Sequence, residues 1–284
     1  MTLPLNPKQT QEILNTLGHS PQKRLGQNFL IDGNIVNKSI ALAEIKESDK
    51  ILEIGPGLGT LSKAILLKGC TLYAVEKDKT LANFLKNSLS PEYNNFHILE
   101  ADCIQFPLGE IQKNKTKNLF KIVANLPYAV ASNWLENVLD IASPLPGIMV
   151  LMLQKEAAER YNALPNSKSF GAISIFLQSA YYIHSTHTVS ASCFHPKPKI
   201  NSTLIRLNLR DNPIYFSKES RKLIRIIFTQ RRKQISSICR KINSKVINSW
   251  LDKLWDRGYE KNIRAEEIDL SSWQLLGYKQ KHAD

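Results

Sequence analysis

The segment ANLPYAVAS (residues 124–132) carries no acid, base or thiol, yet it follows a hydrophobic run that predicts a buried strand. What it offers for chemistry is hydrogen-bond acceptors, namely the side-chain oxygen of Asn125 and the main-chain carbonyl of Leu126. Two such acceptors can take both N–H bonds of an amine as its nitrogen becomes tetrahedral, which leaves the lone pair free to attack. Pro127 fixes the backbone, and Tyr128 offers a face on which a base can stack. The alternative is an ordinary strand end.

Three residue groups earlier in the chain suit a nucleoside. Gly55, Gly57 and Gly59 follow the predicted strand ILEI and open a helix, and a turn without Cβ atoms lets a ligand approach the backbone. Their spacing differs from the dinucleotide motif GxGxxG, which argues against NAD. Glu76 and Asp102 end the next two predicted strands, where they can accept hydrogen bonds from ribose hydroxyls and from an adenine amino group. Each has an ordinary structural alternative, but the set fits S-adenosylmethionine, which has no pyrophosphate.

With this cofactor, the segment around Asn125 becomes a candidate site of methyl transfer to an adenine amine. That amine is a weak nucleophile because its lone pair is delocalised into the ring, and the two acceptors would localise it. No general base is needed before attack, since the nitrogen becomes acidic only after it is methylated. The absence of acid–base residues from the segment is therefore consistent with this chemistry.

Alternating strand and helix patterns up to about residue 155 position these groups. The predicted fold class is α/β, a Rossmann-like and mostly parallel sheet with an antiparallel edge strand, followed by a small C-terminal all-helical domain. We place the boundary after residue 211, giving a cofactor-binding catalytic domain (1–211) and a basic helical domain (212–284). Strands are expected at 51–54, 71–75, 96–99, 120–124, 147–153, 181–189 and 202–209; helices are expected at 35–45, 61–69, 79–89 and 134–142.

The formal net charge of +13 is concentrated in the C-terminal part of the chain. Between residues 221 and 245 there are nine basic residues and no acidic one, which is typical of a protein that binds a polyanion. For a shorter run, a solvated helix face would be the alternative. Binding to a membrane surface is less favoured, because no Trp- or Phe-rich face lies opposite the charged residues. We expect RNA to contact this stretch through Arg221, Arg225, Arg231, Arg232 and Lys233.

Several other classes of protein are disfavoured. No apolar run reaches the roughly 18 residues that a membrane helix needs, and the N-terminus lacks the apolar segment of a signal peptide. Four scattered cysteines indicate neither a disulfide framework nor a zinc site. His184, His187 and His195 lack a carboxylate or cysteine that would complete a set of metal ligands. We therefore expect a cytoplasmic, metal-free monomer that does not act at a membrane.

Further motifs narrow the prediction. LGQNFLID (25–32), LMLQKEAAER (151–160), FGAISI (170–175), FHPKPKINS (194–202) and FTQRRKQI (228–235) resemble those of the ribosomal RNA adenine dimethyltransferases, best those of the bacterial small-subunit (KsgA) family. The resemblance covers nearly the whole chain. It implies transfer of two methyl groups to each of two adjacent adenosines near the 3′ end of small-subunit (16S) RNA.

The resemblance also implies roles for individual residues. Asn28 and Leu30 would lie over the cofactor, together with Gly55, Glu76, Asp102 and Asn125, and Phe194 would stack on the target base opposite Tyr128. The chain departs from the family at residues 129–131, which read Ala-Val-Ala where Asn-Ile-Ser is common, and at Phe170, where Tyr is common. Neither departure removes a proposed acceptor.

Two alternatives remain open. One is the dimethyltransferase of large-subunit (23S) RNA, which shares the NLPY motif, and the other is a non-catalytic nucleic-acid-binding factor on the same fold. Intact Glu76, Asp102 and NLPY argue against the second. As the partner we expect small-subunit ribosomal RNA within an immature 30S subunit, because a preformed loop lowers the cost of unstacking the target base.

Overall fold

The computed structural model describes the chain except for residues 1–5, 112–118, 128–129, 142–143, 243 and 280–284. It divides into two compact units, the first made of Met1–Ala158 with Ile183–Asn208, and the second of Glu159–Tyr182 with Leu209–Asp284. The chain passes from the first unit to the second for the last time between Asn208 and Leu209, close to the boundary predicted after residue 211. Residues 159–182, however, group with the C-terminal residues, because Phe176 packs against Phe216 with ring centroids 5.4 Å apart.

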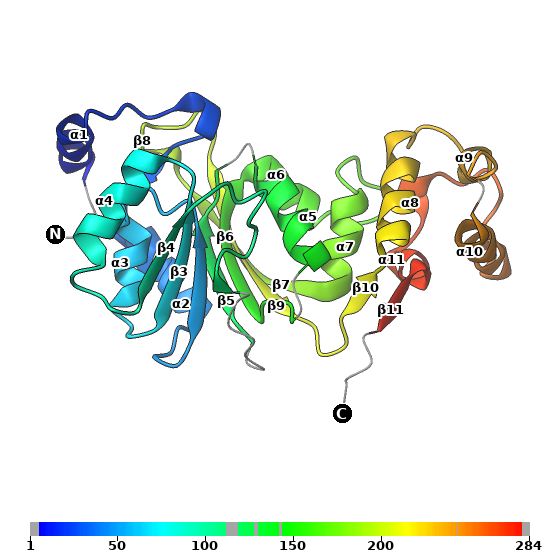
Figure 1. Cartoon of the computed structure of the whole chain (residues 1–284). Helices are drawn as coiled ribbons and strands as arrows, with labels where there is room; N and C mark the ends of the chain where they lie inside the picture. The colour runs from blue at the N-terminus through cyan, green and yellow to red at the C-terminus, as the bar shows by residue number, and fades with distance from the viewer. Residues whose placement is uncertain (1–5, 112–118, 128–129, 142–143, 243, 280–284) are drawn as a thin grey trace. The chain divides into compact units, whose positions relative to one another are not determined.

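The first unit is built on a seven-stranded sheet (Figure 1). Its strands, in sheet order, are β4 (Phe96–Glu100), β3 (Thr71–Glu76), β2 (Lys50–Ile54), β5 (Lys121–Asn125), β6 (Ile148–Gln154), β9 (Ser202–Leu209) and β7 (Tyr181–Val189). Strands β4 to β6 pair in parallel, and β9 pairs antiparallel to β6. The mostly parallel sheet with an antiparallel segment at one edge is thereby confirmed.

Three helices cover one face of this sheet. They are α2 (Gly33–Ala43), α3 (Thr60–Leu66) and α4 (Lys79–Leu89), and their apolar sides share a buried cluster with strand residues such as Ile51, Leu72 and Val123. Asp32 caps α2 by accepting hydrogen bonds from the Asn34 and Ile35 N–H groups at 2.9 and 3.0 Å. One face of each helix is therefore buried against apolar strand residues, as expected of amphipathic helices that cover a sheet.

The opposite face is covered by residues 104–111 and by α5 (Ala131–Ile141). Side chains alternate along a strand, so Val75 points away from the cluster beneath α2 to α4. A Cβ atom on Gly109 would lie 2.7 Å from Val75 Cγ2, which places the 104–111 segment directly on this face. Trp134 of α5 donates to the Pro107 carbonyl at 2.9 Å, so the helix holds this segment against the sheet.

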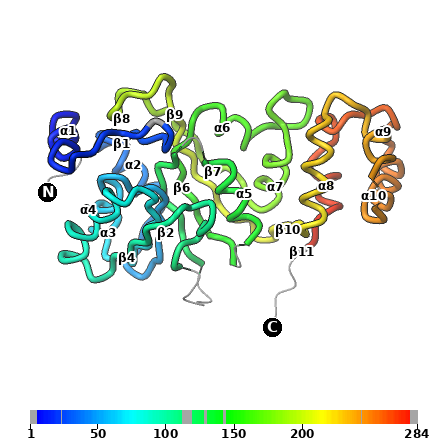
Figure 2. Tube along the Cα trace, turned by 45° about the horizontal axis from the view of Figure 1, so that its top comes forward, coloured from blue at the N-terminus to red at the C-terminus, as the bar shows by residue number. Residues whose placement is uncertain are grey.

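The N-terminal residues add an outer layer to the first unit. Helix α1 (Pro7–Thr16) buries Leu14 in a cluster with Phe29, Leu58 and Leu81. After a 3₁₀ turn (Lys23–Leu25), strand β1 (Phe29–Leu30) pairs antiparallel with β8 (Phe194–His195). Figure 2 shows β1 and β8 side by side although they are distant in the sequence.

The described residues of the second unit are mainly helical and include one small antiparallel ribbon. Its core contains Trp250 and Trp273, stacked with ring centroids 4.7 Å apart. Strands β10 (Ile214–Phe216) and β11 (Gly277–Lys279) pair antiparallel, so the expectation of an all-helical segment after Pro213 is wrong at its two ends. The α-helices of this region are α6 (Lys155–Tyr161), α7 (Ala172–Ala180), α8 (Lys218–Thr229), α9 (Ile235–Cys239), α10 (Lys245–Asp256) and α11 (Leu270–Trp273). It also has 3₁₀ turns at Ala265–Glu267 and Gln274–Leu276. A further 3₁₀ turn, Ala191–Cys193, belongs to the first unit. Among the described residues, no helix has the length and hydrophobicity to cross a bilayer.

Candidate active site

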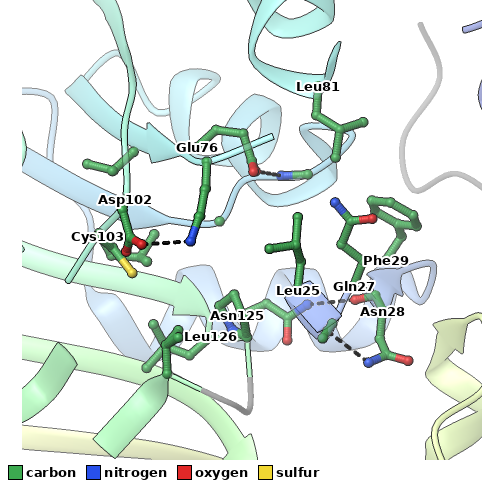
Figure 3. Close-up of a pocket in the computed structure, with 18 of the residues that line it drawn as sticks. Leu25, Gln27, Asn28, Phe29, Glu76, Leu81, Asp102, Cys103, Asn125 and Leu126 are labelled. Atoms are coloured by element: carbon green, nitrogen blue, oxygen red, sulfur yellow. Dashed lines mark hydrogen bonds and ion pairs between the residues drawn. The ribbon is translucent and has the colours of Figure 1, made fainter. Parts of the chain in front are cut away.

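A pocket lies at the carboxyl ends of the central parallel strands. It is lined by the ends of β2, β3 and β5, by residues 101–103 after β4, and by residues 24–29 of the N-terminal segment. Figure 3 shows Glu76, Asp102, Asn125 and Asn28 arranged around one hollow, although they come from four separate parts of the chain. The carboxyl ends of an open parallel sheet are where such folds bind ligands.

The glycine turn after β2 adopts the backbone that its sequence predicts. Gly55, Gly57 and Gly59 all have φ between 61° and 78°, the left-handed region where residues with a Cβ are strained. A Cβ on Gly57 would meet the Phe29 ring at 3.0 Å, and one on Gly55 would meet Pro127 at 3.3 Å. The glycine turn is therefore in close contact with Phe29 on one side and with Pro127 on the other. Gly59 caps α3 and does not line the pocket, so its role is structural.

Glu76 ends β3 with its carboxylate held in place. One oxygen accepts from the Gly57 N–H at 3.1 Å and the other from the Asp78 N–H at 2.9 Å. The residue is only 6% exposed, and this burial raises the pKa of Glu76, although both backbone donors act in the opposite direction. Each oxygen has a further lone pair, so the carboxylate can still accept from two hydroxyls.

Asp102 lies beyond the end of β4 and is paired with Lys77, a residue that the sequence analysis did not single out. The Lys77 ammonium lies 2.7 Å from Asp102 Oδ2, and the Ile104 N–H donates to Oδ1 at 2.8 Å. The Lys77 hydrogen bond, followed by that of Ile104, lowers the pKa of Asp102 below its ordinary value. At this wall of the pocket, the negative charge of Asp102 is thus paired with the positive charge of the exposed Lys77 ammonium.

Asn125 ends β5, and its amide is oriented by the N-terminal segment. Its Nδ2 donates to the main-chain carbonyl of Asn28 at 3.1 Å, which leaves Oδ1 as an acceptor. Leu126 continues the sheet pairing through its N–H, which donates to the Met152 carbonyl at 3.2 Å. Pro127 also lines the pocket, and Tyr128 lies outside the described residues. The two residues named from the sequence as acceptors, Asn125 and Leu126, thus both line the pocket.

Two residues that the family resemblance assigned to the site lie outside the pocket. Leu30 and Phe194 are paired across the β1–β8 ladder and are 4% and 2% exposed, packed in the cluster beneath α2 and α3. The expectation that the Phe194 ring faces a target base is therefore not met in this conformation. A strand pairing between segments so distant in sequence cannot be read from a local motif.

The five basic residues assigned to RNA contact fall into two classes. Arg221 is 5% exposed, donates to the Phe216 carbonyl at 3.2 Å and lies over the Phe176 ring, as does Arg225. These two guanidinium groups serve the packing of the second unit, so the sequence-based assignment of Arg221 to phosphate contact is wrong.

The other three residues lie at the turn between α8 and α9. Arg231 forms an ion pair with Glu266 and donates to the Lys168 carbonyl at 2.7 Å, so its charge is used within the unit. Arg232 and Lys233 are exposed. The run of nine basic residues therefore overstates the charge that faces solvent.

Another buried acid, Glu53, was not singled out from the sequence as a site residue. Its carboxyl accepts from Ser62 Oγ at 2.6 Å and is 2% exposed, and burial raises its pKa to about 8. Ser62 belongs to α3, so the bond joins the end of β2 to the helix that the glycine turn opens. A protonated Glu53 thus braces the turn without adding a charge beside Glu76.

The pocket residues fit S-adenosylmethionine. Gly57 offers a backbone without a Cβ, Glu76 offers oxygen acceptors for ribose hydroxyls, and Val75, Leu81 and Leu126 supply apolar surface. Asp102, Asn28, Gly55 and Asn125, which were also assigned to the cofactor, line the pocket as well, whereas Leu30 and Gly59 do not.

Comparisons with known proteins agree with this geometry. A family model described as ribosomal RNA adenine dimethylase matches residues 18–275. The ribosomal RNA small subunit methyltransferase A of Opitutus terrae is 50% identical over 275 residues, covering 96% of this chain and 98% of the relative. The protein of that name from Lachnoclostridium phytofermentans is 38% identical and covers 95% of both chains.

Two solved structures share the fold. A dimethyladenosine transferase from Plasmodium falciparum has a TM-score of 0.68 at 24% identity, covering 87% of this chain and 95% of the other. The 23S rRNA methyltransferase ErmE has a TM-score of 0.62 at 22% identity, covering 88% of this chain and 98% of the other. The fold class, enzyme class and cofactor predicted from the sequence are thereby confirmed, and the chain belongs to the ribosomal RNA adenine dimethylase family of S-adenosylmethionine-dependent methyltransferases.

Proposed function

We propose that this protein dimethylates the exocyclic amine of two adjacent adenosines near the 3′ end of small-subunit ribosomal RNA, within immature 30S subunits. The observation that carries the proposal is the fixed amide of Asn125, whose Nδ2 is bound by the Asn28 carbonyl and whose Oδ1 is left as an acceptor beside the pocket. The names of the relatives from Opitutus terrae and Lachnoclostridium phytofermentans support the choice of the small subunit.

The chain's own groups would hold the reacting amine in place. S-adenosylmethionine supplies an electrophilic methyl group on its sulfonium, and Glu76, Asp102, Asn28 and the glycine turn would hold it. Asn125 Oδ1 and the Leu126 carbonyl would accept the two amine N–H bonds as the nitrogen becomes tetrahedral. This interaction is strongest in the transition state, so it accelerates the reaction rather than merely tightening binding.

The same pair of acceptors suits a second transfer. A monomethylated adenine amine still has one N–H bond, which either Asn125 Oδ1 or the Leu126 carbonyl can receive. In each transfer the N–C bond would form as the S–CH₃ bond breaks, and the methylated nitrogen would then release its proton to solvent. Neither acceptor takes up that proton, so both remain available for the second transfer. Dimethylation therefore requires no change in the protonation of the site.

RNA would be held by exposed basic residues of the second unit that flank α9 in the sequence. These are Arg232, Lys233, Arg240, Lys241 and Lys245. Contacts of this kind grip phosphates and RNA shape and carry little sequence information. A partly assembled particle supplies the shape, which supports an immature subunit as the substrate over free RNA.

The test is a methylation assay with purified protein and labelled S-adenosylmethionine. Immature small subunits that lack the modification and large-subunit RNA are incubated separately, and the RNA is then digested to nucleosides. We expect dimethyladenosine from the small subunits and little label in large-subunit RNA, with Asn125→Ala as the inactive control. Preferential labelling of large-subunit RNA, or a product that stops at monomethyladenosine, would overturn the proposal.

Predictions of cytoplasmic location and of a monomer accompany this function. All four cysteines are free, as expected in a reducing compartment. The monomer remains a prediction from the sequence.

A further inference from the structure

The N-terminal segment His19–Asn28, which we call the strap, forms one wall of the cofactor pocket. Arg24 to Asn28 line the pocket from this side. Beyond the strap, Phe29 packs within van der Waals distance of the glycine turn, where a Cβ on Gly57 would meet its ring at 3.0 Å. The strap is not part of the sheet, so its position depends on the bonds that tie it down.

Those bonds meet at Asp78, two residues after Glu76. Asp78 Oδ2 accepts from Gln22 Nε2 at 3.0 Å and from Gln27 Nε2 at 3.1 Å, and His19 Nε2 lies 3.6 Å away. The side chain of Asp78 is 4% exposed. Two amide donors therefore satisfy a buried carboxylate oxygen, and an acceptor is what this position requires.

Neither glutamine can turn its amide round to suit a different partner. The Oε1 atom of Gln27 already accepts from the Gln22 N–H at 2.7 Å and lies 3.2 Å from His19 Nε2. The Oε1 atom of Gln22 accepts from Arg24 Nε at 3.0 Å. Flipping either amide would break these bonds, so the direction of both donors toward Asp78 is fixed.

Asp78 is bonded on its other sides to the rest of the site. Its backbone N–H donates to Glu76 Oε1 at 2.9 Å, and its Oδ1 caps α4 by accepting from the Thr80 and Leu81 N–H groups at 3.0 and 3.3 Å. One residue thus joins the strap, the proposed ribose acceptor and the first turn of α4. The position of the strap and that of Glu76 are set together.

We propose that Asp78 is a positioning residue, which holds the strap closed over the cofactor through Gln22 and Gln27. The inference rests on the proposed cofactor site and names residues beyond those predicted to touch the cofactor. When the bonds to Asp78 are weakened, the wall formed by Arg24 to Asn28 opens more often, and the Asn28 carbonyl no longer steadily holds the amide of Asn125. Cofactor dissociation then becomes faster while the sheet stays intact.

The variant Asp78→Asn tests this directly. Asparagine is a good helix cap, so Oδ1 can keep the α4 cap, but the other atom becomes an NH₂ group that faces two amide donors. The matched control is Asp32→Asn, which alters the cap of α2, where the carboxylate accepts from the Asn34 and Ile35 N–H groups and not from the strap.

Two measurements separate positioning from general loss of structure. Isothermal titration with S-adenosylmethionine is expected to give a dissociation constant raised at least about tenfold for Asp78→Asn and unchanged for Asp32→Asn, since the loss of even one of the two bonds to the buried carboxylate corresponds to about that factor. Hydrogen exchange of the backbone amides of residues 22–28 is expected to accelerate in Asp78→Asn alone. Unchanged affinity and unchanged exchange would overturn the proposal.

A double variant tests the route through the strap. If Asp78 acts through its amide partners, Asp78→Asn combined with Gln22→Ala, whose side chain does not line the pocket, is expected to bind the cofactor no more weakly than Asp78→Asn alone. Additive losses would mean that Asp78 acts by another route. Glu76→Ala tests the underlying cofactor site. Unaltered cofactor binding in Glu76→Ala would contradict the site itself. Weakened binding in Glu76→Ala together with wild-type binding in Asp78→Asn would contradict only the role of Asp78.

Discussion

Arg232 and Lys233 provide a quantitative test of how the second unit binds RNA. Both side chains are exposed at the turn after α8, whereas Arg231 beside them is engaged by Glu266 and by the Lys168 carbonyl. Three adjacent basic residues are therefore expected to respond differently to removal of their charge. The comparison is between the double variant Arg232→Ala/Lys233→Ala and the single variant Arg231→Ala.

The expected size follows from the number of exposed charges. Each phosphate contact contributes about 0.7–0.9 to the slope of log affinity against log salt concentration, so the loss of two contacts lowers the slope by about 1.4–1.8. Arg231→Ala leaves the slope unchanged. It instead lowers the free energy of unfolding by about 1 kcal/mol, a modest figure because its ion pair is about one-third exposed and is screened by solvent.

Fluorescence anisotropy with a labelled small-subunit RNA fragment, repeated over a series of KCl concentrations, gives the slopes, and urea unfolding gives the stabilities. A double variant with weaker binding but the wild-type slope would show that these two side chains do not touch phosphates. A reduced slope in Arg231→Ala, at unchanged stability, would equally refute the distinction between the inner and outer charges.

Three more predictions concern the pocket. Glu76→Ala is expected to weaken S-adenosylmethionine binding by about 1–3 kcal/mol in calorimetry, because ribose hydroxyls lose a buried acceptor; equal affinity would refute the assignment. Asn125→Ala is expected to lower turnover while RNA affinity is kept, since the acceptor acts mainly in the transition state, and parallel losses in both would contradict this. Glu53 has a folded pKa of about 8, above its ordinary value of 4.5, so the folded state binds the extra proton and stability falls as pH rises between these values. Glu53→Gln keeps an acceptor for Ser62 and is expected to flatten that decline in urea unfolding from pH 5 to 8; an unaltered pH profile would show that Glu53 is ionised.

The pocket was predictable because its parts follow local patterns. Each strand that carries a pocket residue is a short apolar run ended by a distinctive residue, such as Glu76 or Asn125, and the carboxyl ends of parallel strands must meet at one edge. The glycine turn was equally readable, since alternate glycines after a strand indicate a backbone with positive φ.

The remaining features depend on contacts that sequence spacing does not encode. Arg221 belongs to a basic run, yet its guanidinium lies over Phe176, a residue from a distant helix. Phe194 lies in a proline-rich motif that suggests a loop, yet its pairing with Leu30 buries it. The bonds of Gln22 and Gln27 to Asp78 likewise join residues more than fifty positions apart. These contacts set which side chains face solvent.

The pairing of β10 with β11 has an evolutionary consequence. It brings Ile214 opposite Lys279, so the chain enters and leaves the helical segment between them at the same point. A segment whose ends adjoin can be lengthened or shortened with little strain on the strands it leaves, provided that the residues that pack against α7, such as Arg221 and Arg225, are kept. The exposed turns between α8 and α10 are therefore the places where such a segment can change its RNA-binding surface without disturbing the strand ends around the pocket.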